Sequence, residues 1–202
     1  MIANLLLSVL PVLPADPLPQ EPAKPAATAS NSAGSPFSYT YVQLDFIHGD
    51  IDGFSDGPDG FDLLGSYQLQ NPNLFVFGGI TMLSGDVGAA DVDWDTYAIG
   101  LGYHTPLAPL TDLVFGGSLL LLDTDTSADG TGWSLEAGVR HNASEQFEVD
   151  GTIGVTDFSD TSSNVWLELG AIYKVSPQLG ILGTLLTSDD MDTISIGVRY
   201  NI

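Results

Sequence analysis

A period-two alternation of apolar with small or polar residues runs through most of this sequence and constrains its fold more than any other feature. Between Trp133 and Arg140, the residues Trp, Leu, Ala and Val alternate with Ser, Glu, Gly and Arg. The ranges 96–103 and 165–174 alternate in the same way. Because successive side chains of a β-strand point to opposite faces, each segment is predicted as a strand with two unlike faces. No helical stripe interrupts the pattern, so we predict an all-β domain.

Ten segments show this alternation, and we predict ten strands, or eight if two have been overcounted. The predicted strands cover residues 37–48, 61–70, 74–83, 94–104, 112–122, 132–142, 147–157, 164–175, 179–187 and 193–202. The connections after the second, fourth, sixth and eighth strands are tight, whereas those after the odd-numbered strands are mostly longer and rich in Asp and Gly. Short turns at one end and longer loops at the other are typical of an up-and-down antiparallel barrel of the bacterial outer membrane.

The length and the chemistry of the strands favour a transmembrane barrel over a soluble one. A tilted strand needs about 9 to 11 residues to cross a bilayer, and most of the predicted strands have this length. In a soluble barrel the non-apolar face would carry many Lys and Glu residues, but here it is mostly Gly, Ser and Thr. We therefore predict that the apolar face contacts lipid. The alternative, with the faces reversed, is a secreted soluble barrel that binds an apolar ligand.

The charged residues on the face assigned to the lumen are few, and they include every Lys and Arg of the domain. We predict that they pair with one another, because a buried charge is tolerated only when it is paired. The predicted lumen cluster is Glu136, Arg140, Glu148, Asp150, Glu168, Lys174 and Arg199. Most aromatic residues, including Phe37 and Tyr39, are expected in girdles at the two lipid interfaces. Trp166 lies on the lumen face and is a candidate plug residue.

The composition excludes several classes of protein. Lys and Arg number 4 against 26 Asp and Glu, giving a net charge of −22, which excludes nucleic acid as a direct partner. No cysteine is present, so disulfides and thiolate chemistry are excluded. No Gly-x-Ser-x-Gly elbow occurs, and among the 3 His only His48 falls at the long-loop end, where Asp50 and Asp93 could join it. We predict that the protein is not an enzyme and needs no cofactor.

The longer loops are strongly acidic and offer oxygen ligands for a hard cation. Calcium takes about six to eight such ligands, but no complete calcium-binding loop is present. The sequence therefore predicts at most a loosely bound divalent cation that bridges the rim to lipopolysaccharide phosphates, with solvated turn residues as the alternative. The candidate ligands are Asp50, Asp52, Asp123, Asp125, Asp189, Asp190 and Asp192.

The start of the chain differs in character from the rest. An apolar run from Leu5 to Leu13, followed by Pro and Ala, resembles the core of a secretory signal, although no Lys or Arg precedes it. The next stretch is rich in Pro, Ala, Ser and Asn, which is typical of a linker. We predict a signal peptide at 1–15, a linker at 16–36 and an outer-membrane barrel at 37–202.

The last strand carries the most specific signal, because it resembles the terminal strand by which outer-membrane barrels are recognised for insertion. Its apolar residues are Ile194, Ile196, Val198, Tyr200 and Ile202. Ile202 departs from the pattern, which usually ends in Phe. The ranges 39–44, 75–79 and 93–103 together resemble the small outer-membrane barrel family known from xanthomonads and related proteobacteria. The resemblance implies contacts with lipid and lipopolysaccharide, insertion by the barrel-insertion machinery, and no catalytic motif.

These features predict a small monomeric barrel in the outer membrane of a Gram-negative bacterium. Ten strands leave little interior, whereas an open aqueous channel is characteristic of about 16 to 18 strands. The predicted function is structural or surface-interacting, with a lumen filled by side chains or narrow, and with acidic loops presented to the outside. A narrow gated pore for small solutes is the alternative.

Overall fold

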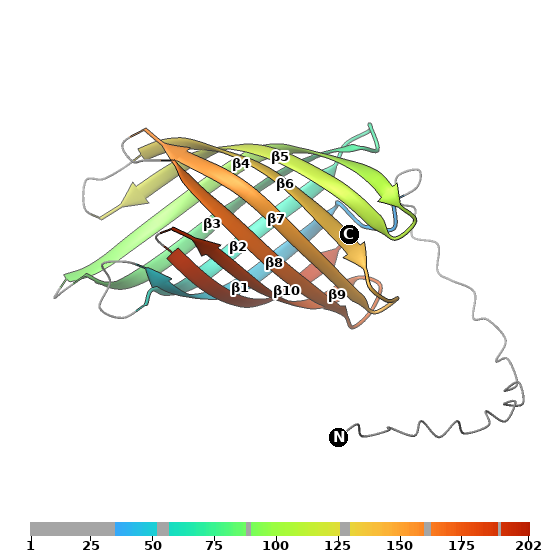
Figure 1. The fold of residues 1–202 in the computed structure, drawn as a ribbon. Coiled ribbons are helices and arrows are strands. Elements are labelled where there is room, and N and C mark those ends of the chain that lie inside the picture. The colour runs from blue at the N-terminus through green and yellow to red at the C-terminus, as the bar shows by residue number, and fades with distance from the viewer. Residues whose placement is uncertain (1–34, 52–56, 88–89, 126–129, 160–162, 190) are drawn as a thin grey trace, which may run out of the picture. The chain divides into compact units, whose positions relative to one another are not determined.

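Ten antiparallel strands close into a single barrel in this computed structural model, which describes residues 35–202 except 52–56, 88–89, 126–129, 160–162 and 190 (Figure 1). The strands are β1 (Tyr41–Ile51), β2 (Asp59–Gln68), β3 (Leu74–Val87), β4 (Ala90–Ala108), β5 (Thr111–Thr124), β6 (Gly130–Asn142), β7 (Phe147–Phe158), β8 (Asn164–Lys174), β9 (Leu179–Ser188) and β10 (Met191–Asn201). Each strand pairs with the next in the sequence, and β10 pairs with β1 to close the sheet. The described residues contain no helix long and apolar enough to cross a membrane.

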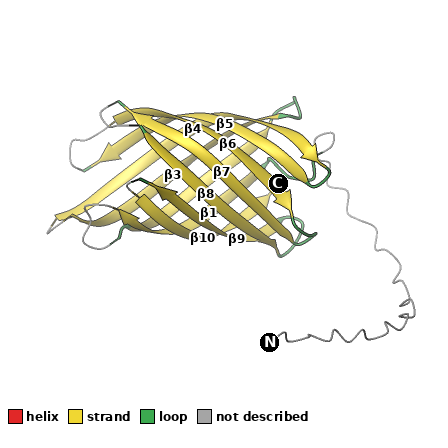
Figure 2. Ribbon diagram, in the orientation of Figure 1, coloured by secondary structure: helices red, strands yellow, loops and turns green. Residues whose placement is uncertain are grey.

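The ten-stranded up-and-down barrel is the fold predicted from the sequence, and the alternative of eight strands is wrong. The strands are 10 to 19 residues long, so each reaches the length that a tilted transmembrane strand requires. The tight turns after β2, β4, β6 and β8 lie at the end where both β1 begins and β10 ends (Figures 1 and 2). We call this end the periplasmic mouth, following the usual orientation of such barrels.

Three predicted strand boundaries are corrected by the structure. The first strand begins at Tyr41 and not at residue 37, because the residues before it turn into the barrel. The strands β3 and β4 continue as a paired hairpin well beyond the predicted ends at 83 and 94. Asp86, Asp91 and Asp93 are therefore part of a hydrogen-bonded ladder, where they were predicted to lie in a loop.

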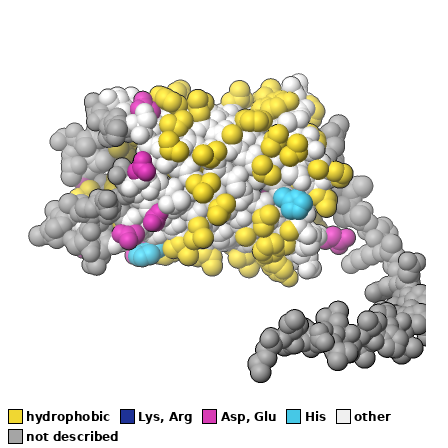
Figure 3. All heavy atoms as spheres, viewed as in Figure 1, with side chains coloured by type: hydrophobic (Ala, Val, Ile, Leu, Met, Phe, Trp, Pro, Cys, Tyr) yellow, Lys and Arg dark blue, Asp and Glu magenta, His cyan; other side chains and the backbone are white. Residues whose placement is uncertain are grey.

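The apolar residues of the strands point outward and cover the barrel as a continuous belt. Ile99 and Leu119, for example, are 69% and 68% exposed. Figure 3 shows hydrophobic side chains over the waist of the barrel and acidic side chains toward its ends. The buried hydrophobic cluster inside is small, consisting of Phe37, Tyr39 and Phe75. This distribution is the reverse of a soluble barrel, so the soluble alternative is wrong.

Large inward side chains face glycines on the neighbouring strand. In several cross-strand pairs a residue lies directly opposite an inward glycine, and its side chain occupies the space that a Cβ on that glycine would need. These pairs include Asp45–Gly197, Phe75–Gly102, Phe77–Gly100, Glu136–Gly116, Asp150–Gly170 and Trp166–Gly154. Because each side chain lies over a glycine, it is held against the wall and leaves the centre of the barrel free.

Candidate functional site

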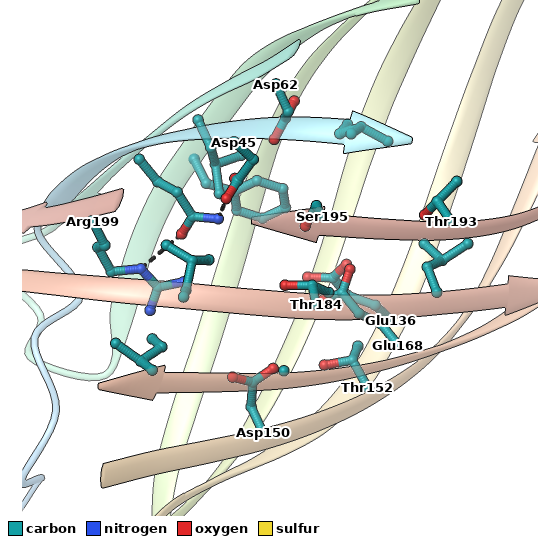
Figure 4. Close-up of a pocket in the computed structure, with 18 of the residues that line it drawn as sticks. Asp45, Asp62, Glu136, Asp150, Thr152, Glu168, Thr184, Thr193, Ser195 and Arg199 are labelled. Carbon is teal, nitrogen blue, oxygen red and sulfur yellow. Dashed lines mark hydrogen bonds between the residues drawn. The ribbon is translucent and has the colours of Figure 1, made fainter. Parts of the chain in front are cut away.

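The interior of the barrel contains a cavity of about 440 Å³, which is the candidate site. Its most distinctive feature is a ring of carboxylates from five different strands, which we call the acidic belt. The acidic belt consists of Asp45, Asp62, Glu136, Asp150 and Glu168. Figure 4 shows these side chains directed into the cavity together with hydroxyl side chains such as Thr152, Thr184 and Ser195.

Three members of the acidic belt are positioned by the glycines opposite them. Asp45, Glu136 and Asp150 each lie over an inward glycine of the adjacent strand. Asp62 is fixed differently, because Thr81 Oγ1 donates a hydrogen bond to Asp62 Oδ1 at 2.8 Å. The carboxylates are therefore held at the wall, with the cavity between them.

The acidic belt is not neutralised by contact with basic side chains. Within the described residues, none of its five carboxylates has a Lys, Arg or His nitrogen within 4.0 Å. Asp45 Oδ2 accepts a hydrogen bond from Gln43 Nε2 at 2.6 Å, while Asp45 Oδ1 is buried and has no hydrogen-bond partner. An unsatisfied buried carboxylate oxygen is costly unless a donor or a cation is at hand. The belt therefore favours positively charged or hydrogen-donating solutes.

The basic residues of the lumen lie nearer to the periplasmic mouth and are engaged elsewhere. Arg140 donates two hydrogen bonds to Glu148 Oε1, from Nε at 2.9 Å and from Nη2 at 2.6 Å. Lys174 Nζ lies 3.6 Å from Glu148 Oε2. Arg199 donates to Gln43 Oε1 at 2.7 Å and lies over the ring of Tyr41, with 4.3 Å from the guanidinium carbon to the ring centre. The positive charges thus stand toward one end of the cavity, where Asp150 of the acidic belt lies opposite Arg140 in the β6–β7 pair.

Residues Ser35–Thr40, which we call the inward segment, fill the periplasmic mouth. Phe37 and Tyr39 are each 2% exposed. The ring of Tyr39 stacks on that of His104, with 3.8 Å between the ring centres, and on that of Phe75 at 5.0 Å. Phe37 and Tyr39 were predicted to belong to an interfacial girdle, and this prediction is wrong because their rings are enclosed by the barrel.

Hydrogen bonds to the wall hold the inward segment. Ser35 Oγ donates to Asp112 Oδ2 at 2.6 Å, and the Tyr39 hydroxyl donates to the same oxygen at 3.0 Å. His104 Nδ1 lies 3.1 Å from that oxygen. Burial, reinforced by the neighbouring Asp112 carboxylate, raises the pKa of the Tyr39 hydroxyl, so this group stays a neutral donor.

Arg140 supports the inward segment from the other side. Its guanidinium carbon lies 4.7 Å from the centre of the Phe37 ring and 4.8 Å from that of Tyr39. Arg140 Nη1 also donates to the backbone oxygen of Ser38 at 3.2 Å. Cation–π contacts of this kind strengthen when water is excluded. The inward segment is therefore held in the mouth by polar and aromatic contacts on two sides.

The structure directs all seven residues of the predicted lumen cluster inward, but it pairs only some of them. Arg140, Glu148 and Lys174 form ion pairs. Glu136, Asp150 and Glu168 belong to the acidic belt, and Arg199 donates a hydrogen bond to the side-chain amide oxygen of Gln43. Trp166 was a candidate plug residue, but it lies over Gly154, with its Nε1 donating to Thr156 Oγ1 at 3.1 Å.

Sequence reasoning missed four inward polar residues, Asp45, Asp62, His104 and Asp112. Their phase in the alternation could have revealed them, since each stands one residue from an outward apolar or aromatic side chain. Asp45, for example, lies between Leu44 and Phe46, which are 47% and 42% exposed.

The predicted metal ligands do not form a site within the part of the chain that the structure describes. No group of three or more His, Asp and Glu residues there is arranged to hold a metal ion. Asp50 and Asp192 are opposite each other in the β1–β10 pair, and Asp123 is exposed near the end of β5. Asp125 and Asp189 are exposed outside the strands, while Asp52 and Asp190 lie outside the described residues. His48 pairs with Asp59 at 2.7 Å, on exposed side chains.

The terminal strand is seated between β1 and β9, with its apolar side chains outward. Its five apolar residues are 46% to 77% exposed, as a lipid-facing strand requires. Whether they direct insertion stays a prediction.

The closed barrel, its outward apolar belt and its polar lumen define the class of the protein as a transmembrane β-barrel of the outer membrane. The chain matches the family model of the outer membrane protein beta-barrel domain over residues 22–201, and it belongs to this family. The relationship to xanthomonad barrels in particular stays a prediction. No curated protein matches the chain in sequence.

Several solved structures are similar to the chain. The KdgM porin in complex with disordered oligogalacturonate is 12% identical, with 80% of this chain and 99% of that chain covered and a TM-score of 0.50. The NanC porin is 9% identical, with 79% and 100% covered and a TM-score of 0.50. Neisserial surface protein A is 18% identical, with 82% and 98% covered and a TM-score of 0.42. At these identities the likeness to the two porins shows the fold alone.

Proposed function

We propose that the protein is a narrow outer-membrane pore that prefers small cations. The observation that carries this proposal is the acidic belt, whose five carboxylates surround a cavity of about 440 Å³ and make no ion pair among the described residues. Rings of carboxylates are the usual means by which a protein pore selects cations. The glycines that hold side chains against the wall supply the room for passage.

The charge distribution favours cations over anions throughout the middle of the lumen. A cleft lined by one sign of charge with low-dielectric walls concentrates ions of the opposite sign. Three basic residues of the lumen oppose this effect. Arg140 and Lys174 are occupied by Glu148, whereas Arg199 donates to Gln43 and keeps its charge at one end of the cavity. The small interior of a ten-stranded barrel restricts the solutes to small ones.

The ligand of a structural relative does not transfer to this chain. The KdgM porin is described in complex with oligogalacturonate, whose sugar units are acids. Carboxylates of such a solute would be repelled by the acidic belt. The porin relatives therefore support a pore on this fold, while the lumen of this chain supports a cation as the solute.

The proposal is tested by the reversal potential of the refolded barrel in a planar bilayer with a tenfold KCl gradient. A pore selective for cations approaches about 59 mV, with the sign set by K⁺. The double variant Glu136→Gln/Glu168→Gln removes two charges of the belt, and we expect its reversal potential to move toward zero. The control Glu145→Gln removes an exposed charge in the turn between β6 and β7 and should leave it unchanged.

A non-conducting scaffold is the second candidate, because the inward segment closes the periplasmic mouth. Phe37 and Tyr39 are almost fully buried there, and Asp112 is 0% exposed. A barrel closed in this way would have a structural or surface-interacting role. Absence of conductance in every variant, including those that disrupt the inward segment, would favour the scaffold.

A further inference from the structure

We propose that the inward segment, Ser35–Thr40, is the gate of the pore and must withdraw from the periplasmic mouth before ions pass. This inference rests on the proposed function. It assigns a regulatory role to a part of the chain that precedes the first strand and that the barrel wall does not need for closure, since β1 pairs with β10 from Tyr41 onward.

The inward segment is attached mainly by side chains and does not form a strand. Its contacts reach Asp112 on β5, Arg140 on β6 and His104 on β4. Three of its backbone oxygens accept hydrogen bonds from the barrel. Arg140 Nη1 donates to the Ser38 oxygen at 3.2 Å, Ser66 Oγ to the Tyr39 oxygen at 2.8 Å, and Ile202 N to the Thr40 oxygen at 3.0 Å. A segment held in this way can leave without breaking the strand ladder.

The main anchor, Asp112, is suited to release as well as to binding. Its Oδ2 receives two hydroxyl donors from the segment and lies 3.1 Å from His104 Nδ1 of the wall, but its Oδ1 is buried without a hydrogen-bond partner. No Lys or Arg of the described chain lies within 4.0 Å of this carboxylate. Burying a carboxylate oxygen without a hydrogen-bond donor costs free energy. This penalty is removed when the segment withdraws and water can donate to Asp112 Oδ1. The unsatisfied oxygen therefore lowers the stability of the docked segment.

The Arg140 guanidinium remains paired with a carboxylate when the segment leaves. Arg140 keeps both of its hydrogen bonds to Glu148. Withdrawal of Phe37 and Tyr39 therefore does not leave a buried cation without a carboxylate partner. Tyr39 also lines the cavity of the acidic belt. Removing its ring from the mouth therefore joins this cavity to the periplasmic side.

The docked position is tested with a single cysteine, because the chain contains none. Ser35→Cys places a thiol at a site that is 6% exposed. We expect a membrane-impermeant maleimide to label it about 100-fold more slowly than Ser144→Cys, which lies in the exposed turn between β6 and β7. Adding Tyr39→Ala, which removes a stacked and hydrogen-bonded ring, should accelerate labelling about 100-fold.

The gating role is tested by the conductance of Tyr39→Ala and Phe37→Ala, with Tyr67→Ala as the control. Tyr67 is 62% exposed and belongs to the outer surface near the same mouth. Heat-modifiable gel mobility confirms that each variant is folded. We expect single-channel open probability to increase about tenfold or more in the first two variants and to stay unchanged in Tyr67→Ala.

Two different results would refute the gate, and only the second would also refute the pore. Full conductance in the unaltered protein with rapid labelling of Ser35→Cys would refute the gate and leave the pore. No conductance in any variant, although Tyr39→Ala releases the thiol for labelling, would refute the pore itself and with it the gate.

Discussion

Replacement of Gly154 by Ala tests whether inward side chains are held against the wall by opposite glycines. A Cβ at this position would lie less than 3.0 Å from three atoms of the Trp166 indole, where van der Waals contact requires about 3.5 to 4.0 Å. The ring must therefore leave the wall. It would lose its hydrogen bond to Thr156, worth about 1 kcal/mol, and overpacking would add about 1 to 3 kcal/mol. We expect a loss of about 2 to 4 kcal/mol.

The assay is urea unfolding of the barrel refolded in lipid vesicles, followed by tryptophan fluorescence and by gel mobility without boiling. Gly183→Ala is the matched control, because its Cβ would meet nothing closer than a backbone oxygen at 3.7 Å, an ordinary contact. We expect the control to unfold at the same urea concentration as the unaltered protein or slightly higher. Equal stability of Gly154→Ala and Gly183→Ala would refute the reasoning, since it would show that the indole does not lie over Gly154.

Three further predictions concern charge and insertion. Glu148→Gln should lower the free energy of unfolding by about 3 to 5 kcal/mol, because it leaves the Arg140 guanidinium without its carboxylate; the urea midpoint measures this, with Glu145→Gln unchanged. Arg199→Gln removes a positive charge from the lumen and should shift the reversal potential further toward the equilibrium potential of K⁺. An unchanged reversal potential would show that ions do not pass near Arg199. Ile202→Phe restores the residue usual at the end of terminal strands and should speed assembly by the insertion machinery in proteoliposomes, whereas an equal rate would show that this position is not read.

The number of strands, and which face of each strand is apolar, were predictable because they depend on local alternation alone. Side chains at positions such as Trp133 and Leu135 are 40% and 55% exposed, as their place on the apolar face indicated. The strand ends were less accurate near the Asp-rich hairpins. Asp and Gly are turn formers, but the β3–β4 ladder continues through them because each backbone group finds a partner on the opposite strand.

The inward segment could not be predicted from local sequence. Phe37 and Tyr39 continue the alternation of β1, so the pattern by itself extends the strand to residue 37. Their position is decided by partners far along the chain, since Tyr39 and Asp112 are 73 residues apart. The glycine pairs were hidden for a related reason, because which residue faces a given glycine depends on the register between strands.

The most direct test of the central claim is the sign of the reversal potential of Tyr39→Ala, in which the mouth is expected to be open, across a tenfold KCl gradient. The acidic belt predicts a potential of the K⁺ sign that falls toward zero when Glu136→Gln/Glu168→Gln is added. A potential of the Cl⁻ sign, or one that the added double variant leaves unchanged, would contradict the assignment of the acidic belt as the path and selector of ions.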